Sequence, residues 1–289
     1  MFSHGSIIGL GLLGGSLALD LRQQFPQMTI TGIARRPATL AEAEALRVGE
    51  RPVFTHLSCD LAAVRTADLI VLCTPVQTSI EQLVAMAPLV SPGTVVTDVG
   101  STKRMVMNAA ATALPAGAFF VGGHPMAGSD RAGLAHVRAG LYRQATWALC
   151  PPPGAEDAAA RLAVVLEALE ARVRIIDADS HDRLVALTSH LPHAVACALA
   201  ARVLGHPDAQ AVRAFIAGGF RDTTRIAAGQ TAMWRDIFQT NRDNMVHELN
   251  AIIADLEQWR DALRAGDPPH LEALLTHAHT LREELNHPR

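Results

Sequence analysis

The chain has 289 residues, of which 49% are hydrophobic and 18% are charged, and its formal net charge is −3 with histidine neutral. This length exceeds one typical domain and the apolar fraction is ample for packed cores, so we expect a globular protein of two domains. A small negative charge without runs of like charge excludes a broad basic surface for nucleic acid. A small-molecule partner is therefore expected.

The most apolar stretch, residues 6–19, is too short to span a bilayer and lacks the basic leader of a signal peptide. Four cysteines follow neither a disulfide framework nor a zinc spacing; they are Cys59, Cys73, Cys150 and Cys197. We therefore expect reduced cysteines in the core of a cytoplasmic protein that does not bind a membrane. The 13 histidines include no HExxH, so no metal site is expected.

Short apolar runs rich in β-branched residues alternate with helical patterns in the first part of the chain. Strands are predicted at residues 6–8, 29–33, 69–73, 95–98, 119–122, 146–150 and 173–176. Helices are predicted at residues 13–24, 40–48, 80–87, 105–114 and 156–171. Such alternation is typical of a doubly wound parallel sheet, so an α/β domain is predicted over residues 1–178.

After residue 179 the pattern is helical, without a convincing strand. Ser180 can cap a long helix over residues 181–204, and the run Gly205-His206-Pro207 ends it. Residues 184–204 are apolar nearly all round, which indicates burial within a bundle or against a second subunit. We therefore predict an all-helical domain at residues 179–289 that contributes to the substrate site and forms a homodimer.

The first predicted strand leads directly into a GxGxxG fingerprint at the start of a helix, Gly9-Leu10-Gly11-Leu12-Leu13-Gly14. Gly9 permits a tight turn, Gly11 lets the backbone approach a pyrophosphate, and Gly14 allows close helix–strand packing. Free N–H groups at the helix start attract the phosphate charge. The motif predicts a Rossmann-type nucleotide site that includes Leu12 and Leu13; the alternative is a glycine-rich turn without a ligand.

The end of the second predicted strand bears on the choice of nucleotide. Ala34 stands where an NAD-preferring protein usually offers a carboxylate to the ribose 2′-hydroxyl, and Arg35 and Arg36 follow it. Guanidinium groups suit the 2′-phosphate, so NADP is predicted over NAD, unless both arginines are merely solvated loop charges. Thr74 and Asp98, at the ends of two other predicted strands, complete the expected cofactor site.

Two more motifs follow predicted strands at the carboxyl edge of the sheet, Asp98-Val99-Gly100-Ser101-Thr102-Lys103 and His124-Pro125-Met126-Ala127-Gly128-Ser129. With the glycine fingerprint, they closely resemble the prephenate and arogenate dehydrogenases of tyrosine biosynthesis. Three segments of the helical half extend the likeness: residues 189–193 (SHLPH), 219–225 (GFRDTTR) and 233–236 (MWRD). The resemblance covers nearly the whole chain, with its motifs in the right order.

The resemblance implies hydride transfer from the cyclohexadienol ring to the nicotinamide and loss of the ring carboxylate as carbon dioxide. The product would be 4-hydroxyphenylpyruvate or tyrosine. His124 would accept a hydrogen bond from the ring hydroxyl and withdraw its proton, while Ser101 would orient that group or the nicotinamide. Arg225 would hold a substrate carboxylate. His190 and His193, three residues apart on one helix, would close the pocket.

Each assignment has a structural alternative. A lone histidine such as His124 is often a satisfied structural residue, and only its flanking motif favours a base. Helix packing is an equal alternative for His190 and His193. Arg221 competes with Arg225 for the anion, and Trp234 is as plausible in the core as in a pocket wall. Lys103, the only lysine among 25 basic residues, is either functional or a chance survivor.

Two other functions remain open at this stage. Another reductase with a nucleotide domain and a helical domain could act on a β-hydroxy acid or an imine, although the helical half has no lysine. A non-catalytic NADP sensor would keep the nucleotide site alone. The sequence does not separate prephenate from arogenate. We expect no appended regulatory domain, so any inhibition by tyrosine is expected to compete at the active site.

Overall fold

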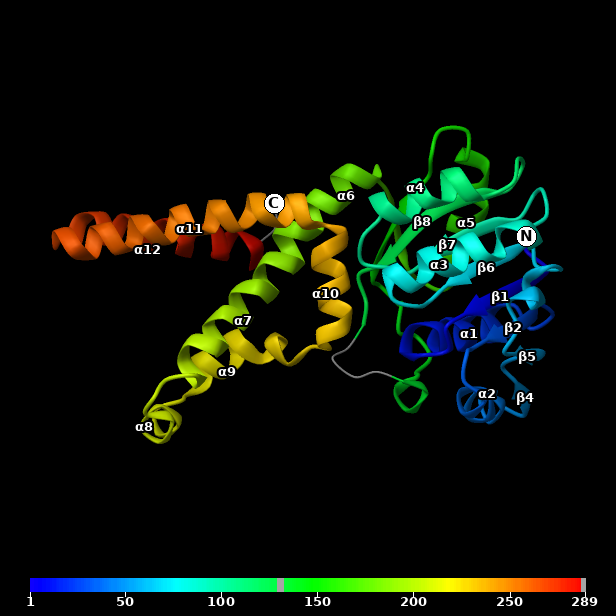
Figure 1. Ribbon diagram of the computed structural model, residues 1–289, viewed down its shortest axis with the longest axis horizontal. Coiled ribbons are helices and arrows are strands. Elements are labelled where there is room, and N and C mark those ends of the chain that lie inside the picture. Colours follow the sequence, from blue (N-terminus) through cyan, green and yellow to red (C-terminus); the bar gives the residue numbers. More distant parts are fainter. Residues whose placement is uncertain (129–132, 287–289) are drawn as a thin grey trace. The chain divides into compact units, whose positions relative to one another are not determined.

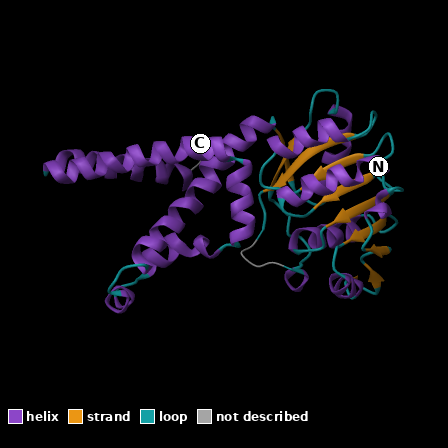
Figure 2. Cartoon of the chain, in the orientation of Figure 1, coloured by secondary structure: helices purple, strands orange, loops and turns teal. Residues whose placement is uncertain are grey.

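The computed structural model describes residues 1–128 and 133–286 (Figure 1). The chain divides into two compact units, residues 1–241 and residues 242–289. The first unit holds all the strands of the described chain and a set of helices, whereas the second is helical (Figure 2). The boundary predicted after residue 178 lies inside the first unit and stays a prediction.

An eight-stranded sheet of order β10-β9-β8-β7-β6-β1-β2-β5 forms the centre of the first unit. Its strands are β1 (His4–Ile8), β2 (Thr29–Ile33), β5 (His56–Ser58), β6 (Leu69–Leu72), β7 (Val95–Asp98), β8 (Phe119–Pro125), β9 (Thr146–Cys150) and β10 (Arg172–Ile175). All neighbours are parallel except β8 and β9. A separate hairpin pairs β3 (Arg47–Val48) with β4 (Arg51–Pro52).

The sheet differs from the sequence prediction in three places. It is mixed rather than wholly parallel, because β9 pairs antiparallel with β8. The three-residue edge strand β5 was not predicted. The helix predicted over residues 40–48 ends at Glu44, and Gly49, with φ +59°, turns the chain into the β3–β4 hairpin instead.

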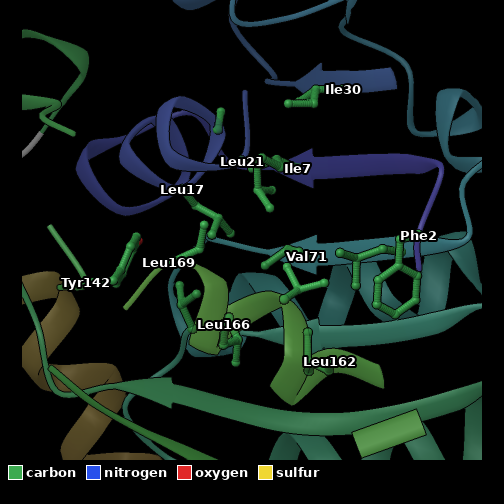
Figure 3. Close-up of a cluster of buried hydrophobic side chains, with 14 of the residues drawn as sticks. Phe2, Ile7, Leu17, Leu21, Ile30, Val71, Tyr142, Leu162, Leu166 and Leu169 are labelled. Carbon is green, nitrogen blue, oxygen red and sulfur yellow. The ribbon is translucent and has the colours of Figure 1, made fainter. Parts of the chain in front are cut away.

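Helices cover both faces of the sheet, and they are α1 (Leu12–Gln24), α2 (Pro37–Glu44), α3 (Val76–Met86), α4 (Arg104–Ala113) and α5 (Glu156–Ala168). Alternate strand residues supply two cores. Ile7 and Val71 pack with α1 and α5 in the larger core, which Figure 3 shows. Ile8 and Ile70 pack with α3 and α4 in the other. Burial of each such side chain stabilises the fold by about 1.5–3 kcal/mol.

A continuous helical stretch from Ala178 to Leu204 leaves the sheet. It consists of α6 (Ala178–Val185), a π-helical turn (Ala186–His190) and α7 (Leu191–Leu204). Asp177, not Ser180, caps it: the Asp177 carboxylate accepts a hydrogen bond from the Ser180 N–H at 2.8 Å. The predicted Ser180 cap was therefore wrong, because the helix begins one turn earlier.

Three further helices complete the first unit, α8 (Ala209–Ala214), α9 (Gly218–Thr224) and α10 (Thr231–Thr240). The second unit contains α11 (Arg242–Ala265) and α12 (Pro268–Asn286). Within residues 179–286 no strand is present, as the sequence predicted. α10 contacts α3, and α6 contacts α4 and β9, so the helical segment reaches the carboxyl edge of the sheet.

By length and hydropathy alone, the Ala178–Leu204 stretch could cross a membrane. The core helix of a soluble protein passes the same test, and His181, Asp182 and His190 on this stretch are buried with polar partners in the same unit. All four cysteines are free thiols. Cys150 is buried, whereas Cys59 is exposed, so the prediction of a core position was wrong for Cys59.

Candidate active site

A pocket of about 460 Å³ in the first unit lies at the carboxyl edge of the sheet, bounded by segments from α7, the turn before α10, and α10. Eight of the predicted site residues line it: Gly11, Leu12, Leu13, Thr74, Ser101, His124, His193 and Arg225. Trp234 and Gln230 line it as well. Ser129, quoted in the second motif, lies outside the described residues. The fold thus brings both predicted motifs and the helical segment to one cavity.

The glycine fingerprint forms the nucleotide end of this pocket. Gly9 has φ +98°, which only glycine adopts readily, and a Cβ on Gly14 would lie 2.1 Å from the Gly9 carbonyl oxygen. A Cβ on Gly11 would meet nothing within 4 Å, so the backbone there is open to a ligand. No side chain caps α1, and its first turn has no acid. These free N–H groups and the helix dipole fit a dinucleotide pyrophosphate.

The loop after β2 carries the groups predicted to select the nucleotide. Ala34 is buried, and its N–H donates to the Ser58 carbonyl at 3.1 Å. Arg35 and Arg36 are exposed at the start of α2, outside the pocket wall. Thr74, which does line the pocket, donates its hydroxyl to Gln82 at 2.7 Å. The exposed guanidinium groups are free to meet an anion from solvent.

His124 at the end of β8 is the first member of a chain of three side chains. Its Nδ1 lies 2.9 Å from Nε2 of His181, and Nδ1 of His181 lies 2.8 Å from a carboxylate oxygen of Asp182. A carboxylate only accepts, so His181 Nδ1 donates to Asp182, and in the tautomer with its single ring hydrogen there, His181 Nε2 is an acceptor. His124 Nδ1 then donates to His181. His124 Nε2 is left as an unprotonated acceptor, on a ring that lines the pocket.

Asp182 is held from several sides. Its two oxygens accept the backbone N–H groups of Lys103 at 2.8 Å and Arg104 at 3.0 Å, at the N-terminus of α4. Asn241 donates to the Asp182 carbonyl at 2.7 Å. Because helix N-termini favour negative charge, α4 stabilises the buried carboxylate. Sequence reasoning missed His181 and Asp182, since their positions suggested only the start of a helix.

The pKa of His124 lies well below its ordinary value, mainly because burial disfavours the imidazolium. The neighbouring His181, Lys103 and His190 lower this pKa further. His124 is therefore neutral at physiological pH, which is the form that can accept a proton from a bound hydroxyl.

The two predicted helix histidines have different surroundings. The His193 ring stacks on Trp234 with centroids 3.5 Å apart and planes at 10°, and both residues line the pocket. His190 is buried behind the pocket wall, where its Nδ1 lies 3.2 Å from Asn241 Nδ2. Trp234 is thus a pocket residue, while His190 packs between helices.

The remaining predicted residues are divided between the pocket and its support. Ser101 and Arg225 line the pocket from the loop after β7 and from the segment after α9. Asp98 does not reach the wall: it is buried, and its oxygens accept the N–H groups of Gly100 and Gly123, each at 2.9 Å, and contact Lys103. No cluster of three metal-ligating side chains occurs in residues 1–128 and 133–286.

Two family models match almost the whole chain. The nucleotide-binding domain of prephenate dehydrogenase matches residues 17–175, and the dimerization domain of prephenate dehydrogenase matches residues 177–277. The chain belongs to the prephenate dehydrogenase family. It is accordingly an NAD(P)-dependent oxidoreductase, and the resemblance inferred from its motifs is confirmed.

Relatives within this family include a cyclohexadienyl dehydrogenase from Zymomonas mobilis, 33% identical over 94% of this chain and 92% of the relative. Among solved structures, a prephenate dehydrogenase from A. aeolicus with hydroxyphenyl propionate and NAD+ has a TM-score of 0.89 and 28% identity, covering 99% of both chains. An arogenate dehydrogenase from Synechocystis has a TM-score of 0.84 and 30% identity, covering 98% of this chain and 99% of that one.

Burial of His190 predicts a pH-dependent stability. Burial lowers the pKa of His190 from 6.5 to about 4, so below pH 6.5 the unfolded chain binds a proton that the folded chain refuses. Stability is therefore lost as the pH falls from 6.5 towards 4. Between about pH 7.5 and about pH 5, the free energy of unfolding should fall by about 2 kcal/mol less in His190→Gln than in wild type.

Urea unfolding at the two pH values measures this difference. His277→Gln, the same change at an exposed position of α12, should keep the wild-type pH dependence. An unchanged pH dependence in His190→Gln would show that the folded protein protonates His190 readily.

Proposed function

We propose that this chain converts prephenate, arogenate or both into 4-hydroxyphenylpyruvate or tyrosine by oxidative decarboxylation, with NADP as cofactor. The observation that carries the proposal is the His124–His181–Asp182 chain, which leaves an unprotonated ring nitrogen on a residue of the pocket wall. A proton acceptor of this kind suits the oxidation of a hydroxyl-bearing carbon.

His124 acts first on the ring hydroxyl of the substrate: Nε2 accepts its proton as the C4–H bond breaks, and His181 and Asp182 stabilise the imidazolium that forms. The glycine fingerprint would hold a nicotinamide nucleotide, which would supply the acceptor for the hydride. Loss of the ring carboxylate as carbon dioxide sends its electron pair into the ring, and the resulting phenolate recovers the proton from His124. No net proton leaves, which agrees with the burial of His181 and Asp182.

Other pocket residues position the substrate. Arg225 presents a planar guanidinium to a substrate carboxylate. Ser101 offers a hydroxyl to the ring oxygen or to the nicotinamide amide, and the stacked His193–Trp234 pair supplies a flat wall for the ring. With these groups around it, the reacting carbon is sheltered from water while hydride is transferred.

The selection of NADP rests on the loop after β2. Ala34 offers no carboxylate to a ribose hydroxyl, and the exposed Arg35 and Arg36 can pair with a 2′-phosphate. A carboxylate at this point would repel that phosphate, so its absence removes the usual barrier to NADP.

The protein acts as a cytoplasmic homodimer in this proposal. Large apolar side chains of the helical part remain exposed in the single chain: Leu184, Leu187, Leu204 and Phe215 of the first unit, and Leu256 and Leu263 of the second. The family model that matches residues 177–277 describes a dimerization domain. Covering these side chains with a second copy removes apolar surface from water.

Reduction of the nicotinamide tests the reaction directly. Purified protein is offered prephenate and arogenate, each with NADP and with NAD, and absorbance of the reduced nicotinamide is followed. At least one substrate should turn over with NADP, and His124→Asn should lower kcat by about 10²–10⁴-fold because the proton acceptor is lost. His206→Asn, at an exposed position after α7, should keep wild-type activity. Binding of NADP without turnover of either substrate would sink the proposal.

Arginine removal tests the nucleotide preference separately. The double variant Arg35→Ala/Arg36→Ala should raise KM for NADP by roughly 10–100-fold through loss of the 2′-phosphate contacts, with KM for NAD nearly unchanged. Arg174→Ala, an exposed arginine on β10 at the far end of the sheet, is the control. Equal effects on both nucleotides would show that these arginines do not select NADP.

A further inference from the structure

Lys103, the only lysine of the chain, is completely buried behind the pocket wall. Its ammonium forms an ion pair with Asp98, which is 1% exposed, and donates to the Gly123 carbonyl at 2.7 Å. A buried charge is costly unless it is paired and hydrogen-bonded, as this one is. The reaction proposed above gives the pair no direct role, because neither side chain lines the pocket.

The Lys103–Asp98 pair contacts the residues that immediately precede Ser101 and His124, the two groups proposed to act on the substrate. Asp98 accepts the N–H of Gly100, which precedes Ser101, and the N–H of Gly123, which precedes His124. Lys103 holds the carbonyl of the same Gly123. The pair therefore fixes the backbone that leads into Ser101 and into His124.

The space around the pair is closed by glycines. A Cβ on Gly100 would lie 2.7 Å from an Asp98 carboxylate oxygen, and a Cβ on Gly122 would lie 3.1 Å from Lys103 Cδ. A Cβ on Gly123 would lie 2.4 Å from the Asp98 carbonyl oxygen. A compact ammonium fits this space, whereas a planar guanidinium is wider and needs more partners. This accounts for a lysine in a chain whose other basic residues are all arginine.

We propose that Lys103 and Asp98 are a positioning pair, which holds the backbone before Ser101 and before His124 in place. The inference rests on the proposed function and deepens it. Neither residue touches the substrate; both act through the two loops.

The Lys103 ammonium also affects the pKa of His124, together with the other charged groups near that ring. Lys103 and the neighbouring His181 and His190 lower the pKa of His124, in addition to burial. The nearest carboxylates are Asp98, beside Lys103, and Asp182, beyond His181, and a negative charge raises the pKa of an imidazole. Removal of the ammonium leaves these carboxylates unbalanced, so the pKa of His124 rises.

Two substitutions separate charge from geometry. Lys103→Met removes the charge and the contacts; kcat should fall about 100-fold, and the acid limb of kcat/KM should move to higher pH by about one unit. Lys103→Arg keeps the positive charge, but the guanidinium does not fit the space between the glycines. We expect kcat to fall at least about 10-fold, while the acid limb of kcat/KM stays at the wild-type pH.

Arg22→Met is the matched control. Arg22 is also a buried cation, 6% exposed, and it donates to the carbonyl oxygens of Pro26, Met28 and Val53. Its loss should lower the melting temperature but leave the pH profile and the kcat of the folded protein unchanged. If Lys103→Met does not fold, Lys103→Arg decides. Wild-type kcat in a folded Lys103 variant, or a loss of activity matched by Arg22→Met, would overturn the positioning role.

A readout without turnover separates this inference from the proposed function. Titration of the His124 imidazole by NMR in the nucleotide-free protein should give a higher pKa in Lys103→Met than in wild type and in Arg22→Met. An unchanged His124 titration would overturn the electrostatic role even if the enzyme turns over its substrate. Failure of wild type to turn over either substrate would instead overturn the proposed function, with the titration still interpretable.

Discussion

The candidate site depends on the hydrogen bonds that the buried carboxylate of Asp182 accepts. Its oxygens accept two N–H groups at the start of α4 and the Nδ1–H of His181. A carboxylate 1% exposed is tolerated only with such partners. The two backbone bonds attach α6 to the start of α4, and the third bond places a ring hydrogen of His181 on Nδ1. When His181 carries only this ring hydrogen, its Nε2 accepts from His124 Nδ1.

This arrangement explains why the site needs both parts of the first unit. The carboxyl edge of the sheet supplies Ser101 and His124, whereas the stretch after residue 177 supplies His181, Asp182 and His193. Without the helical segment, His124 would be a histidine with an ordinary pKa. Burial by the helical segment lowers its pKa, and the cavity between strand ends and helices gives the substrate a place to be held.

The sequence predicts those elements whose physical requirements show in a short stretch of residues. Gly9 has a positive φ and Gly14 packs against the Gly9 carbonyl, so the spacing of the fingerprint predicts the turn that the structure contains. β-branched runs likewise predict most of the strands. The direction of β9 depends on its connection to β8, and the Asp177 cap depends on where a helix starts within a turn; neither is fixed by composition.

Partners distant in sequence were beyond such reasoning. His124 and His181 are 57 positions apart, and nothing near His181 marks it as a partner of the pocket histidine. Asp98 was expected to bind the cofactor, but it serves the loops through backbone N–H groups, which have no signature in the side-chain pattern. The lone lysine was visible from composition, but its partner and its burial became evident only in the fold.

The most direct test of the account is the tautomer of His124, measured by ¹⁵N NMR of histidine-labelled protein near neutral pH. The account predicts a neutral ring with its hydrogen on Nδ1 and a bare Nε2, because Asp182 orients His181 and His181 orients His124. A hydrogen on Nε2, or an imidazolium at that pH, would contradict it, since neither form could accept a proton from a substrate in the pocket.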